Sequence, residues 1–279
     1  MTLETMISKL RFTNGIDLAV LQKIRKDEKS IEAIAQTAYQ GEDFDFALCR
    51  RMPLTRLAVM TCLLLRKYDD YKVKGVPDDI IFDTFRDVSL RAKLYYEKTG
   101  QAGISKADVI WFRHIMNAAI FKIGALQFQP FKMIYLDEET LGDQYITFTK
   151  EQKAALPAGA PVINCHIQQG ADLSPEAVSA SFRNAKRFFS THFSAQYKAF
   201  LCYSWLLYPP MVKNLSPNSN IKQFAAHFAI IGACDDSAQA IEYLFRHGKR
   251  ALPANATTLQ KLAFEHIELF GFACGIIVI

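Results

Sequence analysis

The chain has 279 residues, half of them hydrophobic, which is enough for one large domain or two of ordinary size. No apolar run reaches 18 residues, and the acid-bearing N-terminus lacks the apolar core of a signal peptide, so we expect a cytoplasmic protein without a membrane partner. The net charge of +5 is spread along the chain and the six cysteines stand singly without zinc spacing, so we predict no nucleic-acid partner and no metal site.

Residues 3 to 119 are predicted to form helices. The clearest is Pro77–Glu97, which opens on a proline and an acid, as first turns favour, and ends at Gly100. Ser105 and Asp108 have the spacing of a capping box and predict the start of the next helix. Apolar side chains recur through the first of these helices at helical spacing: Ile81, Phe85, Val88, Ala92 and Tyr95.

Two acids on this helix, Asp83 and Asp87, are interpreted as surface or interdomain charges. Asp87 and Arg91 are four residues apart, which predicts an ion pair along the helix. Nothing in the spacing indicates a shared buried carboxylate site, so we do not predict acid–base chemistry here.

The pattern changes at Gly124, and we place a domain boundary there, giving residues 1–123 and 124–279. In Ala125–Leu136 polar and apolar residues alternate, which predicts a strand with Gln127 and Gln129 on one face. The phase slips at Pro130, so we expect a bulge, an edge strand or a break into two strands there.

The next segments alternate between strands, loops and helices. Tyr145–Thr149 is a short strand candidate, and Glu151–Pro161 is predicted to be a loop because it contains two prolines and a glycine. Val162–Ile167 is predicted to be a strand and Gln168–Leu173 a loop. The sequence Ser174-Pro175-Glu176 then has the features of a helix start.

The last 80 residues continue in the same way. Ala199–Leu207 is strand-like and is followed by a short helix at a proline pair, while Phe224–Ala233 reads as helix passing into strand. Ser237–Arg246 and Thr258–Phe270 are predicted helices, and Gly275–Ile279 is a buried strand. Strands alternating with helices indicate a mixed α/β layer, so the fold class is α+β, with an all-helical N-terminal part.

Three blocks of this sequence carry a resemblance to a known family: DTFRDVSLRAKLYYEKTGQAGIS leading to FKIGALQFQ, CHIQQGADLSPEAVSASFRNAKRFF, and FLCYSWLLYPPMVKNLSPNSNIKQF. They resemble a bacterial family of acyltransferase-domain proteins with an N-acyltransferase N-terminal domain and a GNAT-like C-terminal domain. The resemblance spans the middle two-thirds of the chain, in the family's order. It implies a GNAT-like α/β domain with a mixed sheet, an acyl-CoA such as acetyl-CoA as co-substrate, and a small-molecule amine as acceptor.

The acetyltransferase phosphate loop is a Q/R-x-x-G-x-G/A turn whose backbone amides hold the pyrophosphate at a helix N-terminus. The loop after Val162–Ile167 supplies one glycine of that motif, and it departs from the His-Ile-Pro-x-Gly usual in the family. Asp172 and Glu176 stand beside it, where they would repel a pyrophosphate. The resemblance nevertheless implies four residues of this loop as the cofactor site: Gln168, Gln169, Gly170 and Ala171.

His166 and Ser204 are the candidate catalytic residues. His166 ends a strand before a loop, where functional groups gather in α/β proteins, and it could deprotonate an amine or simply bond a neighbouring backbone group. Ser204 shares a strand face with Cys202, a face that could line an acceptor pocket; Cys202 itself is interpreted as packing. Four further residues are candidates for substrate binding, with solvated-face, core or helix-capping roles as alternatives: Gln127, Gln129, Trp205 and Asn220.

Two functions compete. An acyl-CoA-dependent N-acyltransferase, in which an amine attacks a thioester directly, predicts a cleft with exposed backbone amides near the loop. A non-catalytic GNAT-like binding or assembly protein with a degenerate cofactor site predicts a cleft filled by aromatic side chains. A nucleic-acid-binding regulator built on residues 1–120 would need a basic face, which the sequence lacks.

Overall fold

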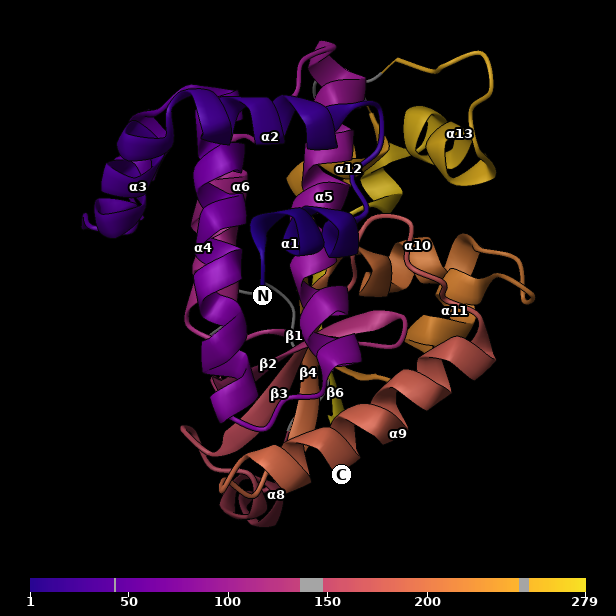
Figure 1. Ribbon diagram of the computed structural model, residues 1–279. Coiled ribbons are helices and arrows are strands. Elements are labelled where there is room, and N and C mark those ends of the chain that lie inside the picture. Colours follow the sequence, from indigo (N-terminus) through magenta and orange to yellow (C-terminus); the bar gives the residue numbers. More distant parts are fainter. Residues whose placement is uncertain (43, 136–147, 246–250) are drawn as a thin grey trace. The chain divides into compact units, whose positions relative to one another are not determined.

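Figure 1 shows the computed structural model, which describes residues 1–42, 44–135, 148–245 and 251–279. The chain divides into two compact units, Met1–Ile123 and Gly124–Ile279. The helical prediction for the first unit is confirmed, although a three-residue strand at its end was not predicted. Its elements are α1 (Leu3–Leu10), α2 (Ile16–Lys26), α3 (Glu28–Thr37), the 3-10 helix η1 (Ala47–Arg50), α4 (Pro53–Val73), α5 (Asp78–Thr99), α6 (Lys106–Met116) and β1 (Phe121–Ile123).

The ends of α5 and α6 follow from local chemistry. Helix α5 begins directly after Pro77 and ends at Gly100, whose φ of 70° is the left-handed conformation that glycine adopts without strain. At the start of α6 the Ser105 hydroxyl accepts a hydrogen bond from the Asp108 amide at 3.1 Å, and the Asp108 carboxylate accepts one from the Ser105 amide at 2.8 Å. The predicted capping box is therefore present.

Tyr71 of α4 lies at the centre of the helical core. Its ring is fully buried and packs edge-on against Phe85 of α5 and Phe121 of β1, with centroids 5.2 and 5.8 Å apart. Its hydroxyl donates a hydrogen bond to the Ile115 carbonyl of α6 at 2.9 Å. Burial raises the pKa of this phenol, so it remains a neutral donor that joins α4 to α6.

A six-stranded mixed sheet, in the order β1-β2-β3-β4-β6-β5, confirms the predicted fold class. Strands β3 and β4 are parallel, while the pairs β2–β3, β4–β6 and β5–β6 are antiparallel. The last strand in sequence, β6, therefore lies between β4 and β5. The strands of the second unit are β2 (Leu126–Lys132), β3 (Pro161–His166), β4 (Ala199–Ser204), β5 (Ala229–Cys234) and β6 (Phe272–Val278).

Strand β2 runs without interruption through Pro130. Its residues pair with β3 in one continuous register from Gln127, opposite His166, to Lys132, opposite Pro161. Of the three possibilities expected at Pro130, the bulge and the break into two strands are therefore wrong; the other neighbour of β2 in the sheet is the three-residue strand β1. Proline is tolerated in a strand where its nitrogen is not needed by the partner, and the ladder with β3 shows no register shift across it.

The two faces of this sheet are covered differently. On one face α9 (Pro175–His192) lies across the strands (Figure 1), and its Phe182 ring packs against Phe128 of β2 and Phe200 of β4 with centroids 5.7 and 5.0 Å apart. The opposite face carries a separate buried apolar cluster at one end. Its members are Met133, Leu156, Ala160, Val162, Ala199, Leu201, Ile231, Cys274 and Ile276.

The predicted loop Glu151–Pro161 is wrong in its first half, where the chain forms α8 (Lys150–Ala155). Thr149 and Gln152 make a complete capping box at its start, and that signal outweighs the proline and glycine that follow. The strand candidate Tyr145–Thr149 lies largely outside the described residues, apart from its last two positions.

The remaining connections are helical, as predicted. After β4 come the 3-10 turn η2 (Trp205–Leu207), α10 (Pro209–Asn214) and α11 (Asn220–Ala225), so the predicted passage from helix to strand is confirmed at β5. Between β5 and β6 lie α12 (Ala238–Leu244), α13 (Thr258–Glu265) and the 3-10 turn η4 (Ile267–Leu269).

Candidate functional site

A row of polar side chains lies on the sheet face opposite α9. Gln127 pairs with His166 and Gln129 pairs with Asn164 across β2 and β3, and directly paired residues place their side chains on the same face. Gln127 and Asn164 are buried, while Gln129 and His166 are half-buried. The two glutamines proposed from sequence and the candidate base therefore belong to one cluster.

His166 is held by a direct contact with Gln129. The His166 Nε2 atom lies 3.0 Å from the Gln129 Oε1 atom. In the tautomer that carries its proton on Nε2, the ring donates to this carbonyl oxygen and the lone pair lies on Nδ1. The contact thus restrains the orientation of the imidazole.

Strands β3 and β4 share only a short stretch of parallel ladder. The paired positions are Ile163 with Phe200 and Asn164 with Leu201, yet β3 continues for two residues and β4 for three beyond them. The backbone edges of these strand ends therefore face each other without ladder pairing. In open α/β sheets ligands bind beyond the carboxyl ends of the strands, which is where His166 lies.

The loop that follows β3 is a tight turn with glycine in a required position. The Ala171 amide donates to the Gln168 carbonyl at 3.1 Å, and Gly170 has φ +77°, a left-handed conformation that other residues adopt only with strain. Gln169 and Gly170 are exposed, and their amides donate to no other group of the described chain. The turn therefore presents backbone N–H groups to solvent in front of α9.

Asp172 and Glu176 are both exposed at this helix start, as the sequence indicated. The Asp172 carboxylate accepts a hydrogen bond from the Ser174 amide at 2.9 Å, and this backbone hydrogen bond lowers the pKa of Asp172 below its ordinary value. A fixed negative charge therefore stands next to the turn, and it takes up one of the N–H groups that an anion could otherwise use.

Ser204 and Cys202 are buried on β4, on the α9 side of the sheet. The Ser204 hydroxyl accepts a hydrogen bond from the Leu206 amide at 3.1 Å and so caps the turn η2. Cys202 is fully buried beside Cys165, and the hydrogen bond to that thiol together with burial raises the pKa of Cys202, which opposes a nucleophilic thiolate. Ser204 and Cys202 lie on the opposite face of the sheet from His166.

Trp205 and Asn220 are placed outside the polar cluster. The sequence assigned Trp205 to a strand, but β4 ends at Ser204, and Trp205 starts η2 because the Ser204 cap turns the chain there. The Trp205 ring is buried and packs against Phe270 with centroids 6.1 Å apart. Asn220 is exposed in the first turn of α11, whose preceding residue Ser219 makes no capping hydrogen bond.

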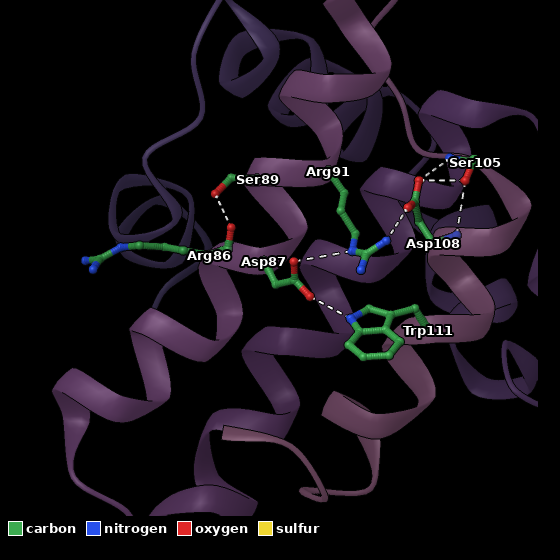
Figure 2. Close-up of polar contacts among 7 residues, drawn as sticks. All are labelled: Arg86, Asp87, Ser89, Arg91, Ser105, Asp108 and Trp111. Carbon is green, nitrogen blue, oxygen red and sulfur yellow. Dashed lines mark hydrogen bonds and ion pairs between the residues drawn. The ribbon is translucent and has the colours of Figure 1, made fainter. Parts of the chain in front are cut away.

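Asp87 in the helical unit corrects the sequence interpretation. Instead of lying at the surface, it is 1% exposed and accepts a hydrogen bond from the Trp111 indole at 2.7 Å. Figure 2 shows the Arg91 guanidinium between two carboxylates, with its Nε atom 3.3 Å from Asp87 and its Nη1 atom 3.0 Å from Asp108. The predicted pair of Asp87 and Arg91 is present, but it belongs to a clamp joining α5 to α6.

Asn164 was missed by the sequence interpretation. Its side chain is 7% exposed, and its Oδ1 atom is buried without a hydrogen-bond partner in the part of the chain that the structure describes. The available signal was a polar residue in the middle of the apolar strand Val162–Ile167, two positions before His166. A buried polar atom without a partner is rare in folded proteins.

Within the described ranges, no three or more His, Cys, Asp or Glu side chains are grouped to hold a metal ion. None of the described helices is long and apolar enough to cross a membrane.

The mixed sheet, with α9 following β3 and the polar cluster at the parallel strand ends, defines a GNAT-like acyltransferase fold. The family model for the GNAT-like C-terminal domain matches residues 120–273, more than half of the chain, and the model for the N-acyltransferase N-terminal domain matches residues 7–118. The chain belongs to the family that joins these two domains, as its sequence blocks indicated. A comparison with curated proteins gives no match.

Several solved structures share this fold. An acyltransferase in complex with decanoyl-CoA and teicoplanin superimposes with a TM-score of 0.72 at 17% identity, covering 98% of this chain and 86% of that chain. The same values hold for an acyltransferase in complex with CoA and 10C-teicoplanin. An acyltransferase in complex with decanoyl-CoA gives a TM-score of 0.69 at 19% identity. At these identities the likeness establishes the fold.

Proposed function

We propose that this protein is an acyl-CoA-dependent N-acyltransferase, with residues 124–279 forming the transferase domain and residues 1–123 a separate helical domain. The observation that carries the proposal is His166, held by Gln129 two residues beyond the point where β3 and β4 stop pairing. The family and the fold support it, because the structural neighbours hold decanoyl-CoA, CoA and teicoplanin. All six cysteines are unpaired thiols, which suits the reducing cytoplasm that we propose as its location.

The residues present suit an acyl-CoA in three respects. The turn Gln168–Ala171 offers exposed backbone amides, the N-terminus of the 18-residue helix α9 favours negative charge, and Gly170 leaves open space where another residue would place a Cβ atom. These are the features that hold a phosphate group. The acyl-CoA, when bound, supplies an activated thioester carbonyl.

In the proposed reaction the acceptor nitrogen bonds to the thioester carbonyl carbon and the C–S bond breaks. His166 accepts the proton that the amine loses, and the thiolate leaving group then takes up that proton. No covalent intermediate on the protein is needed, which agrees with the raised pKa of Cys202.

The first test is a thermal-shift titration with CoA, acetyl-CoA and decanoyl-CoA. A ligand that binds only the native state at about 100 times its Kd stabilises it by about 2.7 kcal/mol, so the Tm should rise by about 5–10 °C. A second test identifies the acceptor. Release of free thiol from the acyl-CoA donor is measured with primary amines and with the matching alcohols as acceptors. Faster thiol release with amines than with alcohols would support an amine acceptor.

One observation favours the alternative, a non-catalytic GNAT-like binding protein. The charge of Asp172 stands beside the turn, and its carboxylate occupies the Ser174 amide. If no CoA compound at millimolar concentration changes the Tm, the cofactor site is degenerate and this alternative holds.

The charge of Asp172 predicts a salt-dependent effect on CoA binding. We expect Asp172→Asn to tighten the Kd for CoA by about two- to fivefold in 0.1 M salt, because it removes a negative charge beside the phosphate-binding turn. The gain should shrink in 0.5 M salt, and calorimetric titration measures both values.

Asp236 is the matched control for this prediction. It makes the same kind of contact before α12, accepting a hydrogen bond from the Ala238 amide at 2.8 Å. It follows β5, three strand positions from β3 in the sheet order, or about 14 Å, which exceeds the screening length of about 10 Å at 0.1 M salt. Asp236→Asn should therefore leave the Kd unchanged, and equal effects of the two variants would contradict a phosphate site at the turn.

A further inference from the structure

The Asn164 Oδ1 atom is a buried hydrogen-bond acceptor without a donor in the described part of the chain. The Asn164 side chain is 93% buried in the middle of β3. Leaving such an atom unsatisfied destabilises the folded state, and a leucine of similar shape would avoid that penalty. The chain retains a polar atom here at a cost in stability, which points to a donor that arrives with a ligand.

Asn164 lies between the buried apolar cluster and the polar contact of His166 with Gln129. Val162, two residues before it on the same face, and Leu201, its partner on β4, belong to the buried apolar cluster. Gln129, its partner on β2, and His166, two residues after it, form the polar contact described above. Asn164 is also the last β3 residue paired with β4, so a ligand entering between the strand ends meets it where the ladder begins.

The chemistry of the missing group follows from these neighbours. An amide oxygen needs an N–H or O–H donor. The polar side chains on this face of β2, β3 and β4 are two glutamines, one asparagine, one histidine and Tyr203, with no carboxylate among them. Burying an ammonium ion without a carboxylate is unfavourable, whereas a neutral amide N–H is matched by one carbonyl oxygen.

We infer that Asn164 is a positioning residue for the acyl donor, its Oδ1 atom accepting a hydrogen bond from an amide N–H of the pantetheine arm. This inference rests on the proposed function. The pantetheine arm is linear and carries two secondary amides close to the thioester, so it supplies the neutral N–H that this site lacks. The bond would fix the thioester along β3, on the strand that ends in His166.

The test uses Asn164→Leu and two independent measurements. Without ligand, the Tm of the variant should rise by about 2–4 °C or more, because an unsatisfied buried oxygen is replaced by a methyl group. With CoA and decanoyl-CoA as probes, the Kd from calorimetric titration should weaken by about tenfold, since the amide N–H of the ligand loses its acceptor. Asn164→Val repeats both measurements with a smaller side chain that suits a strand.

Ser181→Ala is the matched control. Ser181 is also buried in the second unit, but its hydroxyl is satisfied, accepting from the Ala125 amide at 2.8 Å and donating to the Ala177 carbonyl at 2.7 Å. Its replacement should lower the Tm and leave the Kd for CoA unchanged.

The outcomes separate the two proposals. If the wild-type protein binds no CoA compound, the proposed function fails and the inference fails with it. If the wild type binds and both Asn164 variants bind equally well, only the inference is overturned. A lower Tm of the ligand-free Asn164 variants also overturns it, because the amide then has a structural partner.

Discussion

Replacing His166 by alanine should reduce kcat/KM for acyl transfer by about 10²–10⁴-fold, the usual contribution of a general base. The Kd for CoA should stay within about twofold, because the imidazole acts on the acceptor nitrogen rather than on the donor. The Tm should change little, since His166 is only half-buried. Steady-state thiol release and calorimetric titration measure the two constants separately.

His227 provides the control for this substitution. It is an exposed histidine in the same unit, near the Phe182 ring but remote in sequence from β3. His227→Ala should leave both constants unchanged. If His166→Ala keeps full transfer activity while the wild type remains active, His166 is not the base and the proposed chemistry must use another group.

Gln129 tests how His166 is oriented. In Gln129→Leu the imidazole loses this contact, so its orientation is less restrained and kcat should fall with little change in KM for the donor. In Gln129→Glu the new carboxylate stabilises the protonated imidazole. The acidic limb of the pH–rate profile should then move to higher pH by about one unit, because the base must be deprotonated to act.

What the sequence could predict here is what local chemistry determines. The end of α5 at Gly100 and the start of α6 at Ser105 follow from residues within a few positions, and both were predicted. The start of α8 depends on an equally local signal, the capping box of Thr149 and Gln152, whereas the loop prediction rested on Pro157 and Gly159, which follow the helix.

What the sequence could not predict depends on strands distant in the chain. The contact of His166 with Gln129 exists because β2 and β3 pair antiparallel in one register, although the residues are 37 positions apart. The insertion of β6 between β4 and β5 is set by sheet assembly as a whole. The separate roles of the two sheet faces, which place Ser204 on the side away from His166, follow from the same pairing.

The interpretation of Asp87 as a surface or interdomain charge failed for a related reason. A helix position is exposed or buried according to what packs against it, and α6 brings Trp111 and Asp108 to this part of α5. The spacing of Asp87 and Arg91 predicted their ion pair correctly, because that contact lies within one helix. The burial of Asp87 depends on the packing of α6 against α5, which the spacing of residues within α5 does not show.

Asp87→Ala should therefore lower the free energy of unfolding of the helical unit by about 2–4 kcal/mol. Breaking a buried ion pair costs about 3–5 kcal/mol, and the 26% exposure of Arg91 calls for a discount because water can solvate its guanidinium. The Trp111 indole loses its acceptor at the same time. Urea unfolding followed by Trp111 fluorescence measures the change.

The chain provides a selective reporter and a matched control. Its two tryptophans lie one in each unit, Trp111 in the first and Trp205 in the second, so a Trp205→Phe background makes fluorescence report the helical unit alone. Asp83 lies one turn before Asp87 on α5, is 44% exposed and pairs with Arg86. Asp83→Ala should cost no more than about 0.5 kcal/mol, as is usual for exposed pairs.

A third variant separates the two contacts of Asp87. Trp111→Phe removes the N–H donor but leaves the carboxylate paired with Arg91, so its cost should be about 1–2 kcal/mol, measured by circular dichroism because the reporter is lost. The double variant with Asp87→Ala should lose less free energy of unfolding than the sum of the losses of the two single variants, because both substitutions remove the same hydrogen bond. Equal costs for Asp83→Ala and Asp87→Ala would show that the buried clamp does not stabilise the packing of α5 against α6.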